Sequence, residues 1–246
     1  MAQPSPAAPS SVRQPSYVAA PTVLESEYGS LTASGLSPTE SLAWAQRVDA
    51  AARSVRAAGL VTDWDGRLTV VIPAGEADFV AMAGTPADSA SAVTTCTGGV
   101  STILVNPAIL DSGNEWLTST LVHEGVHAAL GSACVPTDDQ REWATEGLAE
   151  SVAAGADPAT ADRNHHLVMD YLADHPVPTA LPENLMTLTD YALAQLAVDQ
   201  VKAHHTDKAD DLLDRAIHQA STLTRAETAR VTGWYVAELA RLAASA

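Results

Sequence analysis

The chain has 246 residues, of which 46% are hydrophobic, so it can bury a substantial core in one large domain or two small ones. Its 30 acidic residues against 13 basic ones give a formal net charge of -17, which argues against a nucleic-acid partner because such partners require a basic patch. No apolar run approaches the ~20 residues that a membrane-spanning helix needs, so no membrane span is expected.

Residues 1–35 are predicted to form a disordered leader. As far as about Leu24 the segment is rich in Ala, Pro and Ser, and it lacks the apolar stretch of a signal peptide. Such a segment either follows an export signal that has been removed or begins a cytoplasmic protein. The first alternative, a secreted or cell-envelope protein, is preferred.

A helix and three strands are predicted next. Apolar residues recur at helical spacing from Pro38 to about Ala58, and Gly59 ends this helix. The strands, of which the last two form a hairpin, are Leu68–Ile72, Ala92–Thr97 and Ser101–Val105.

From Asn114 onward the pattern is helical. Helices are predicted over residues 115–130, 137–154, 160–173, 188–205, 208–221 and 225–244. The second begins at Thr137 with a capping-box pattern and stops at Gly155. Strands followed by helices predict an α+β fold. We divide it into an N-terminal subdomain (36–135), with the sheet and the first of these helices, and a helical C-terminal subdomain (136–246).

Residues 123–127 read His-Glu-Gly-Val-His, the pattern H-E-x-x-H. On a helix, His123 and His127 lie on one face, where both imidazoles can bind one Zn²⁺ at about 2.0–2.1 Å. Glu124 is offset by about 100° and lies beside the metal. There it can act as the general base for a metal-activated water.

A catalytic zinc needs a third protein ligand, and Glu146 in the next predicted helix can supply it. Eighteen residues separate it from His127, with a turn between the two helices. Glu150 lies on the same helix face, where it can accept a hydrogen bond from the second ring nitrogen of His123. The segment around the H-E-x-x-H pattern is otherwise apolar, and a metal would compensate the burial of its polar side chains.

Residues 122–127 together with residues 143–150 (Trp-Ala-Thr-Glu-Gly-Leu-Ala-Glu) resemble the gluzincin pattern H-E-x-x-H…W-x-x-E-G-x-A. The chain is most similar to the small peptidase MA-like proteins common in actinobacteria, which are distantly similar to the M1 aminopeptidases. The resemblance implies a zincin-like fold, in which a sheet of three or more strands covers the active-site helix and a helical subdomain follows. It also places Trp143 and Glu150 around the metal ligands.

The resemblance further implies that Tyr191 is catalytic, as the donor to the oxyanion of the tetrahedral intermediate. His165, His166 and Tyr171 are the rival candidates for this role. One departure concerns the amine-anchoring motif of the M1 aminopeptidases: the corresponding region, residues 94–106, has no acidic residue. Aminopeptidase activity is therefore not implied.

The leading hypothesis is zinc-dependent hydrolysis of a peptide or protein substrate, which would lie extended beside the strand Ser101–Val105. Two alternatives remain at this point: a dedicated leader-peptide or processing protease, and a zinc-binding protein without turnover. Cys96 and Cys134 are expected to lie close together, because in zincins the sheet packs over the active-site helix. They form either one disulfide, which would indicate an oxidising compartment, or two free thiols.

Overall fold

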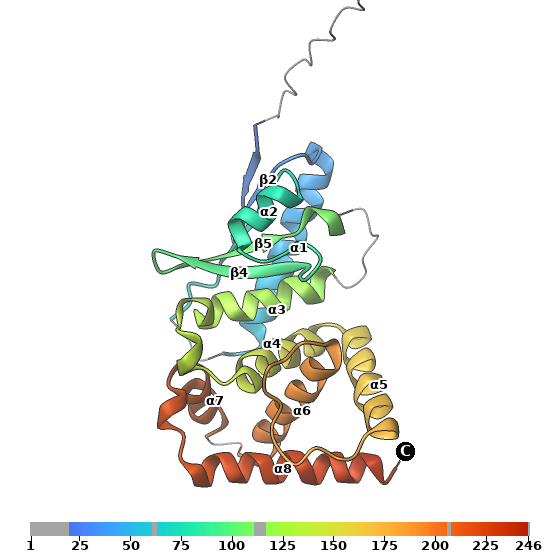
Figure 1. Ribbon diagram of the computed structural model, residues 1–246. Helices are drawn as coiled ribbons and strands as arrows, with labels where there is room; N and C mark the ends of the chain where they lie inside the picture. Colours follow the sequence, from blue (N-terminus) through green and yellow to red (C-terminus); the bar gives the residue numbers. More distant parts are fainter. Residues whose placement is uncertain (1–19, 61–62, 111–116, 206–207, 246) are drawn as a thin grey trace, which may run out of the picture.

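The computed structural model describes residues 20–60, 63–110, 117–205 and 208–245. Within them the protein is α+β, with a mixed five-stranded sheet and eight α-helices (Figure 1). The strands are β1 (Thr22–Glu25), β2 (Gly29–Ala33), β3 (Leu68–Ile72), β4 (Ala92–Thr97) and β5 (Val100–Val105). The helices are α1 (Pro38–Ala57), α2 (Glu76–Ala83), α3 (Leu117–Leu130), α4 (Glu142–Ala156), α5 (Pro158–Asp174), α6 (Leu188–His204), α7 (Ala209–His218) and α8 (Arg225–Ala243).

The strand order is β1-β2-β3-β5-β4, with β2, β3 and β5 mutually parallel and with β1 and β4 antiparallel to their neighbours. The expected substrate position beside Ser101–Val105 is therefore wrong, because β5 is paired on both sides. Its hairpin partner β4 lies outside it, and β3 pairs with it through Val70 and Val71. Among the described strands, β4 and β1 form the two edges of the sheet.

Strands β1 and β2 lie within the segment that was predicted to be a disordered leader. That prediction is wrong for residues 22–33, whereas residues 1–19 lie outside the described part of the chain. Leu31 and Ala33 are buried, and β2 is paired in parallel with β3, some 40 positions later. A five-residue strand whose partner is this distant leaves little local signal in the sequence.

Most predicted helices are confirmed to within a few residues, and the main exception is the start of α4. Residues 137–139 form a 3-10 turn, and α4 begins at Glu142 after Arg141, which provides no side-chain cap. The helix ends at Ala156, one residue beyond the predicted stop at Gly155. Its first turn is instead anchored by a backbone bond, in which the amide of Arg141 donates to Ala216 O at 2.8 Å.

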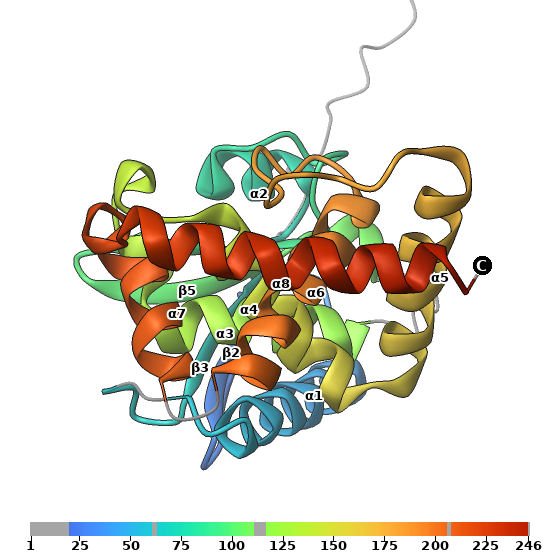
Figure 2. The ribbon, with the colours of Figure 1, turned by 90° about the horizontal axis from the view of Figure 1, so that it is seen from below.

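The sheet edge and the helices that carry the candidate site residues form consecutive layers. Helix α3 lies between β4 and α4 (Figure 1), α6 packs against α4, and α8 crosses the outer side of α6 (Figure 2). One buried core runs through these layers, from Leu31 in the sheet to Leu242 in α8. No helix among the described residues is long and apolar enough to cross a membrane.

Helices α4 and α6 are packed tightly at Gly147. A Cβ atom added there would lie 2.3 Å from the backbone oxygen of Ala194 and 2.9 Å from Cγ2 of Val198. We expect Gly147→Ala to lower the free energy of unfolding by about 1–3 kcal/mol, because the backbone of α6 would have to move. Gly155→Ala is the matched control, since a Cβ there meets no atom within 4 Å. Denaturant titration of both variants checks this, and equal stability of the two would contradict it.

Cys96 and Cys134 form a disulfide with a Cα–Cα distance of 5.2 Å, so the expected proximity is confirmed. The bond joins the end of β4 to the turn after α3 across a sequence separation of 38. We expect replacement of both cysteines by Ala to cost about 3–4 kcal/mol of unfolding free energy, chiefly because the unfolded chain gains freedom. Denaturant titrations with and without reductant measure this. Reductant should destabilise the wild type and leave the double variant unchanged.

Candidate metal centre

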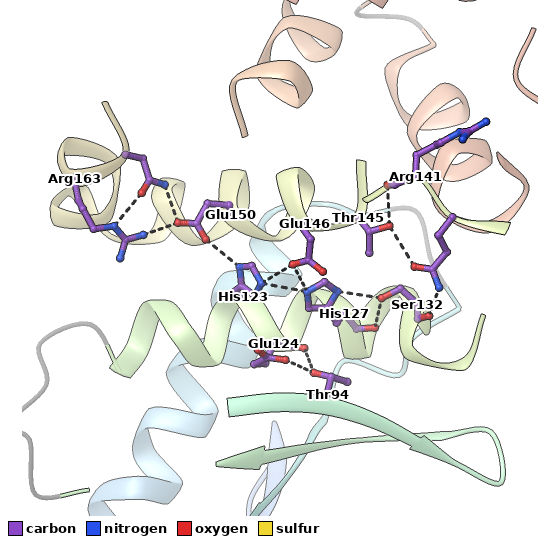
Figure 3. A network of polar contacts seen from close by, with 12 residues as sticks. Thr94, His123, Glu124, His127, Ser132, Arg141, Thr145, Glu146, Glu150 and Arg163 are labelled. Carbon is purple, nitrogen blue, oxygen red and sulfur yellow. Dashed lines mark hydrogen bonds and ion pairs between the residues drawn. The ribbon is translucent and has the colours of Figure 1, made fainter. Parts of the chain in front are cut away.

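Helix α3 presents its polar residues to two different neighbours. His123 and His127 point toward α4, whereas Glu124 points toward β4 (Figure 3). Gly125 faces away from both histidines and packs against the core. A Cβ atom on Gly125 would lie 3.0 Å from Val55 Cγ2 and 3.2 Å from Leu68 Cδ1. Close packing against α1 and β3 therefore accounts for a glycine inside this helix.

Three potential ligand atoms converge between α3 and α4. Oε2 of Glu146 lies 3.1 Å from Nε2 of His123 and 3.2 Å from Nε2 of His127, and the two imidazole nitrogens are 3.2 Å apart. Ligands at about 2.0–2.1 Å from a tetrahedral metal are separated by roughly 3.3 Å. The three side chains therefore fit a single metal ion of zinc's size without rearrangement.

The contacts of the two Nδ1 atoms, on the far side of each imidazole ring, explain why the three converging atoms need a cation between them. Nδ1 of His123 lies 3.0 Å from Oε2 of Glu150, and Nδ1 of His127 lies 3.1 Å from Oγ of Ser132. If both Nδ1 atoms donate protons to these oxygens, both Nε2 lone pairs face each other and the Glu146 carboxylate. Such a group of acceptors is repulsive unless a proton or a metal ion lies between them.

Glu150 is itself held by two residues of α5. Its Oε1 accepts hydrogen bonds from Nη2 of Arg163 at 2.6 Å and from Nδ2 of Asn164 at 2.8 Å (Figure 3). Asn164 also donates to Oε1 of Gln195 on α6, at 2.7 Å. These contacts fix the carboxylate that orients His123. Sequence analysis did not find Arg163, Asn164 or Ser132, because nothing in their local sequence links them to the metal ligands.

Burial and neighbouring charges act in opposite directions on the pKa values of Glu146 and His123. Burial would raise the pKa of Glu146, but the neighbouring imidazoles of His127 and His123 lower it well below its ordinary value. Burial would likewise lower the pKa of His123, but hydrogen bonds to Glu146 and Glu150 raise it well above its ordinary value. A proton on His123 therefore takes the place of the cation when no metal is bound.

Zinc uptake by the metal-free protein is accordingly expected to release a proton. Because its pKa is raised, His123 is protonated at pH 6.5 and somewhat above, and a metal on Nε2 must displace that proton. Affinity should decrease as the pH falls, beginning at a higher pH than for an ordinary histidine. Calorimetric titrations in two buffers of different ionisation enthalpy measure the release. A binding enthalpy that does not depend on the buffer would contradict this prediction.

Glu124 is held from the side of the sheet. The hydroxyl of Thr94 on β4 lies 2.7 Å from Oε2 of Glu124 and 2.9 Å from its backbone oxygen (Figure 3). The Glu124 side chain lines two cavities, of about 390 and 360 Å³, and His123 lines both as well. Glu124 therefore borders both cavities beside the ligand cluster without being part of that cluster.

Tyr191, in the first turn of α6, borders the same two cavities as Glu124. Its ring centroid lies 6.0 Å from that of His123, and it lines both cavities. Among the described residues, its hydroxyl has no hydrogen-bond partner. Burial, together with the charges of Glu146 and Glu124, raises the pKa of Tyr191 above its ordinary value. The phenol therefore stays protonated and can donate a hydrogen bond into the site.

No protein family, curated protein or solved structure matches this chain. The resemblance to gluzincins accordingly rests on the two sequence patterns. The structure by itself shows a group of two imidazoles and one carboxylate, His123, His127 and Glu146, that could hold a metal ion.

The remaining candidates do not line the two cavities at the ligand cluster. Trp143 is buried in the helical core and lines a different cavity, together with residues of α7 and α8, and its place around the metal ligands stays a prediction. Tyr171 stacks on His175, with ring centroids 4.5 Å apart. His165 and His166 are exposed on α5, and neither lines the cavities at the ligand cluster.

Proposed function

We propose that the protein is a zinc-dependent peptidase of the gluzincin type, with a zincin-like arrangement of sheet edge, active-site helix and ligand-bearing second helix. The observation that carries the proposal is the convergence of His123, His127 and Glu146 at tetrahedral spacing. Glu124 lies next to this group and outside it, which is the position of a general base rather than of a ligand. Zinc is favoured because two imidazoles and one carboxylate, with a further position open, suit its catalytic sites.

Bound zinc would act as a Lewis acid that polarises the scissile carbonyl and acidifies the attacking water. Glu124 accepts the proton of that water as the new carbon–oxygen bond forms. It then delivers the proton to the leaving nitrogen as the carbon–nitrogen bond breaks, so that an amine and a carboxylic acid result. The hydroxyl of Tyr191 donates to the oxygen that becomes negatively charged in the transition state.

The edge strand β4 supports binding of an extended substrate. It is paired with β5 on one side, and its other side borders the ligand cluster, where Thr94 contacts Glu124. A peptide that adds to this edge gains backbone hydrogen bonds independently of its side chains. The disulfide at the end of β4 supports an oxidising compartment, and therefore a secreted or cell-envelope protein.

Metal analysis combined with a peptide library tests this function. Purified protein is expected to take up one zinc per chain, and the zinc-loaded form to cleave peptides, whereas a chelator should abolish both. Replacement of His127 by Ala should abolish zinc uptake in the same assay. Stoichiometric zinc without cleavage of any library member would instead favour a zinc-binding protein without turnover.

A further inference from the structure

Two cavities meet at the ligand cluster, one on each side. The cavity of about 390 Å³ extends toward α5 and includes Arg163, whereas the cavity of about 360 Å³ extends toward the turn after α3 and includes Ala133. Both are lined by His123, Glu124 and Tyr191, so these three residues stand where the cavities adjoin. A chain lying along β4 would therefore find space on both sides of the reacting bond.

Within the described part of the chain, neither cavity is lined by an unpaired cation that could bind a terminal carboxylate. Among the described residues that line them, Arg163 is the one Lys or Arg. Its guanidinium donates to Glu150 at 2.6 Å and to Oδ1 of Asn164 at 3.0 Å, so its charge is already paired (Figure 3). An exopeptidase that reads a terminal carboxylate needs an unpaired cation at the end of its cleft.

The described lining residues also leave no free carboxylate for a terminal amine. The acidic residues that line the two cavities, within the described part of the chain, are Glu124, Glu146 and Glu150. Glu146 faces both histidines of the cluster, Glu150 is bound by His123 and Arg163, and Glu124 is the proposed base. Among these described lining residues, no carboxylate remains to hold an α-amino group beside the ligand cluster.

We infer that the protein cleaves internal peptide bonds of extended chains, with substrate residues occupying both cavities. This inference rests on the proposed peptidase function and goes beyond it, because it specifies endopeptidase action. Selectivity then comes from the side chains on either side of the scissile bond and from the backbone edge of β4, without a contribution from the chain ends.

Matched peptides test the inference. A library peptide that the zinc-loaded protein cleaves is synthesised in four forms, with each end either free or blocked by N-acetylation or C-amidation. Values of kcat/KM for the four forms are expected to agree within about threefold. A loss of tenfold or more on blocking either end would overturn the inference while leaving the peptidase function intact. If freshly loaded protein cleaves no library peptide at all, both the inference and the peptidase function are contradicted.

Two variants test the use of both cavities. Ser91 lines only the first cavity and Ala133 only the second, so Ser91→Trp and Ala133→Trp each place bulk on one side. For each variant, kcat/KM is measured for a peptide that extends into the altered cavity and for a peptide that is truncated on that side. The value for the extended peptide is expected to fall at least about tenfold relative to the value for the truncated one. Because both peptides are measured on the same variant, a general loss of activity does not affect this ratio. Leu42→Trp, at an exposed position on α1, is the control. If only one of the two cavity variants has an effect, the cleft is one-sided and the inference fails.

Discussion

Zinc-loaded Glu124→Gln protein is expected to retain its metal and to lose peptidase turnover by about 10²–10⁴-fold. Glutamine keeps the shape of the side chain and can still contact the Thr94 hydroxyl, but it cannot accept the proton of the attacking water. Because the ligand atoms belong to His123, His127 and Glu146, zinc affinity should change little. Steady-state kinetics together with zinc titration of the same sample measures both effects.

Glu76→Gln is the matched control for this variant. Glu76 is exposed at the start of α2, so the same loss of charge there should leave turnover unchanged. Loss of zinc from the Glu124→Gln variant would show that Glu124 is a ligand rather than the base. Full turnover with zinc retained would assign the proton transfer to another group.

Tyr191→Phe is expected to lower kcat by about 10²–10³-fold, the usual effect of removing one oxyanion donor. The loss should appear in kcat more than in KM, since the hydrogen bond strengthens as charge develops on the oxygen. Zinc affinity should stay the same, because the phenol does not belong to the three side chains proposed as ligands. Kinetics at saturating and at low substrate concentrations separate the two parameters.

Tyr171→Phe provides the control for the loss of a phenolic hydroxyl. Its ring stacks on His175, and it does not line either cavity at the cluster, so its removal should leave kcat unchanged. Equal effects of the two substitutions would indicate damage to helix packing rather than loss of a donor. An unchanged kcat in Tyr191→Phe would remove Tyr191 from the mechanism.

The sequence predicted those parts of the site that depend on one helix or on two neighbouring helices. His123 and His127 share a face because of helical periodicity, and Glu146 follows after a short turn. Thr94, Ser132 and Asn164 could not be predicted in this way, because each reaches the site from a different element. Their contacts depend on how the sheet, the turn after α3 and helix α5 pack around α3 and α4.

The order of the strands in the sheet could not be predicted from the sequence pattern either. The hairpin of β4 and β5 was predicted correctly from alternation and turn residues, but either strand could have formed the edge. That choice was decided by β3, which pairs with β5. Similarly, β2 is stabilised by its parallel pairing with β3, so the composition of the preceding segment led to the wrong boundary for the leader.

Helices α3 and α4 follow each other in the sequence, which lowers the entropic cost of bringing their side chains together. His123 and Glu146 are separated by 23 positions, whereas His123 and Tyr191 are separated by 68 (191 minus 123). Because the entropy of loop closure grows with the logarithm of loop length, uniting His123 with Tyr191 costs roughly 1 kcal/mol more than uniting the two ligands. The proposed metal-binding group is therefore the local one, and the proposed catalytic set requires the slower, long-range docking of α6.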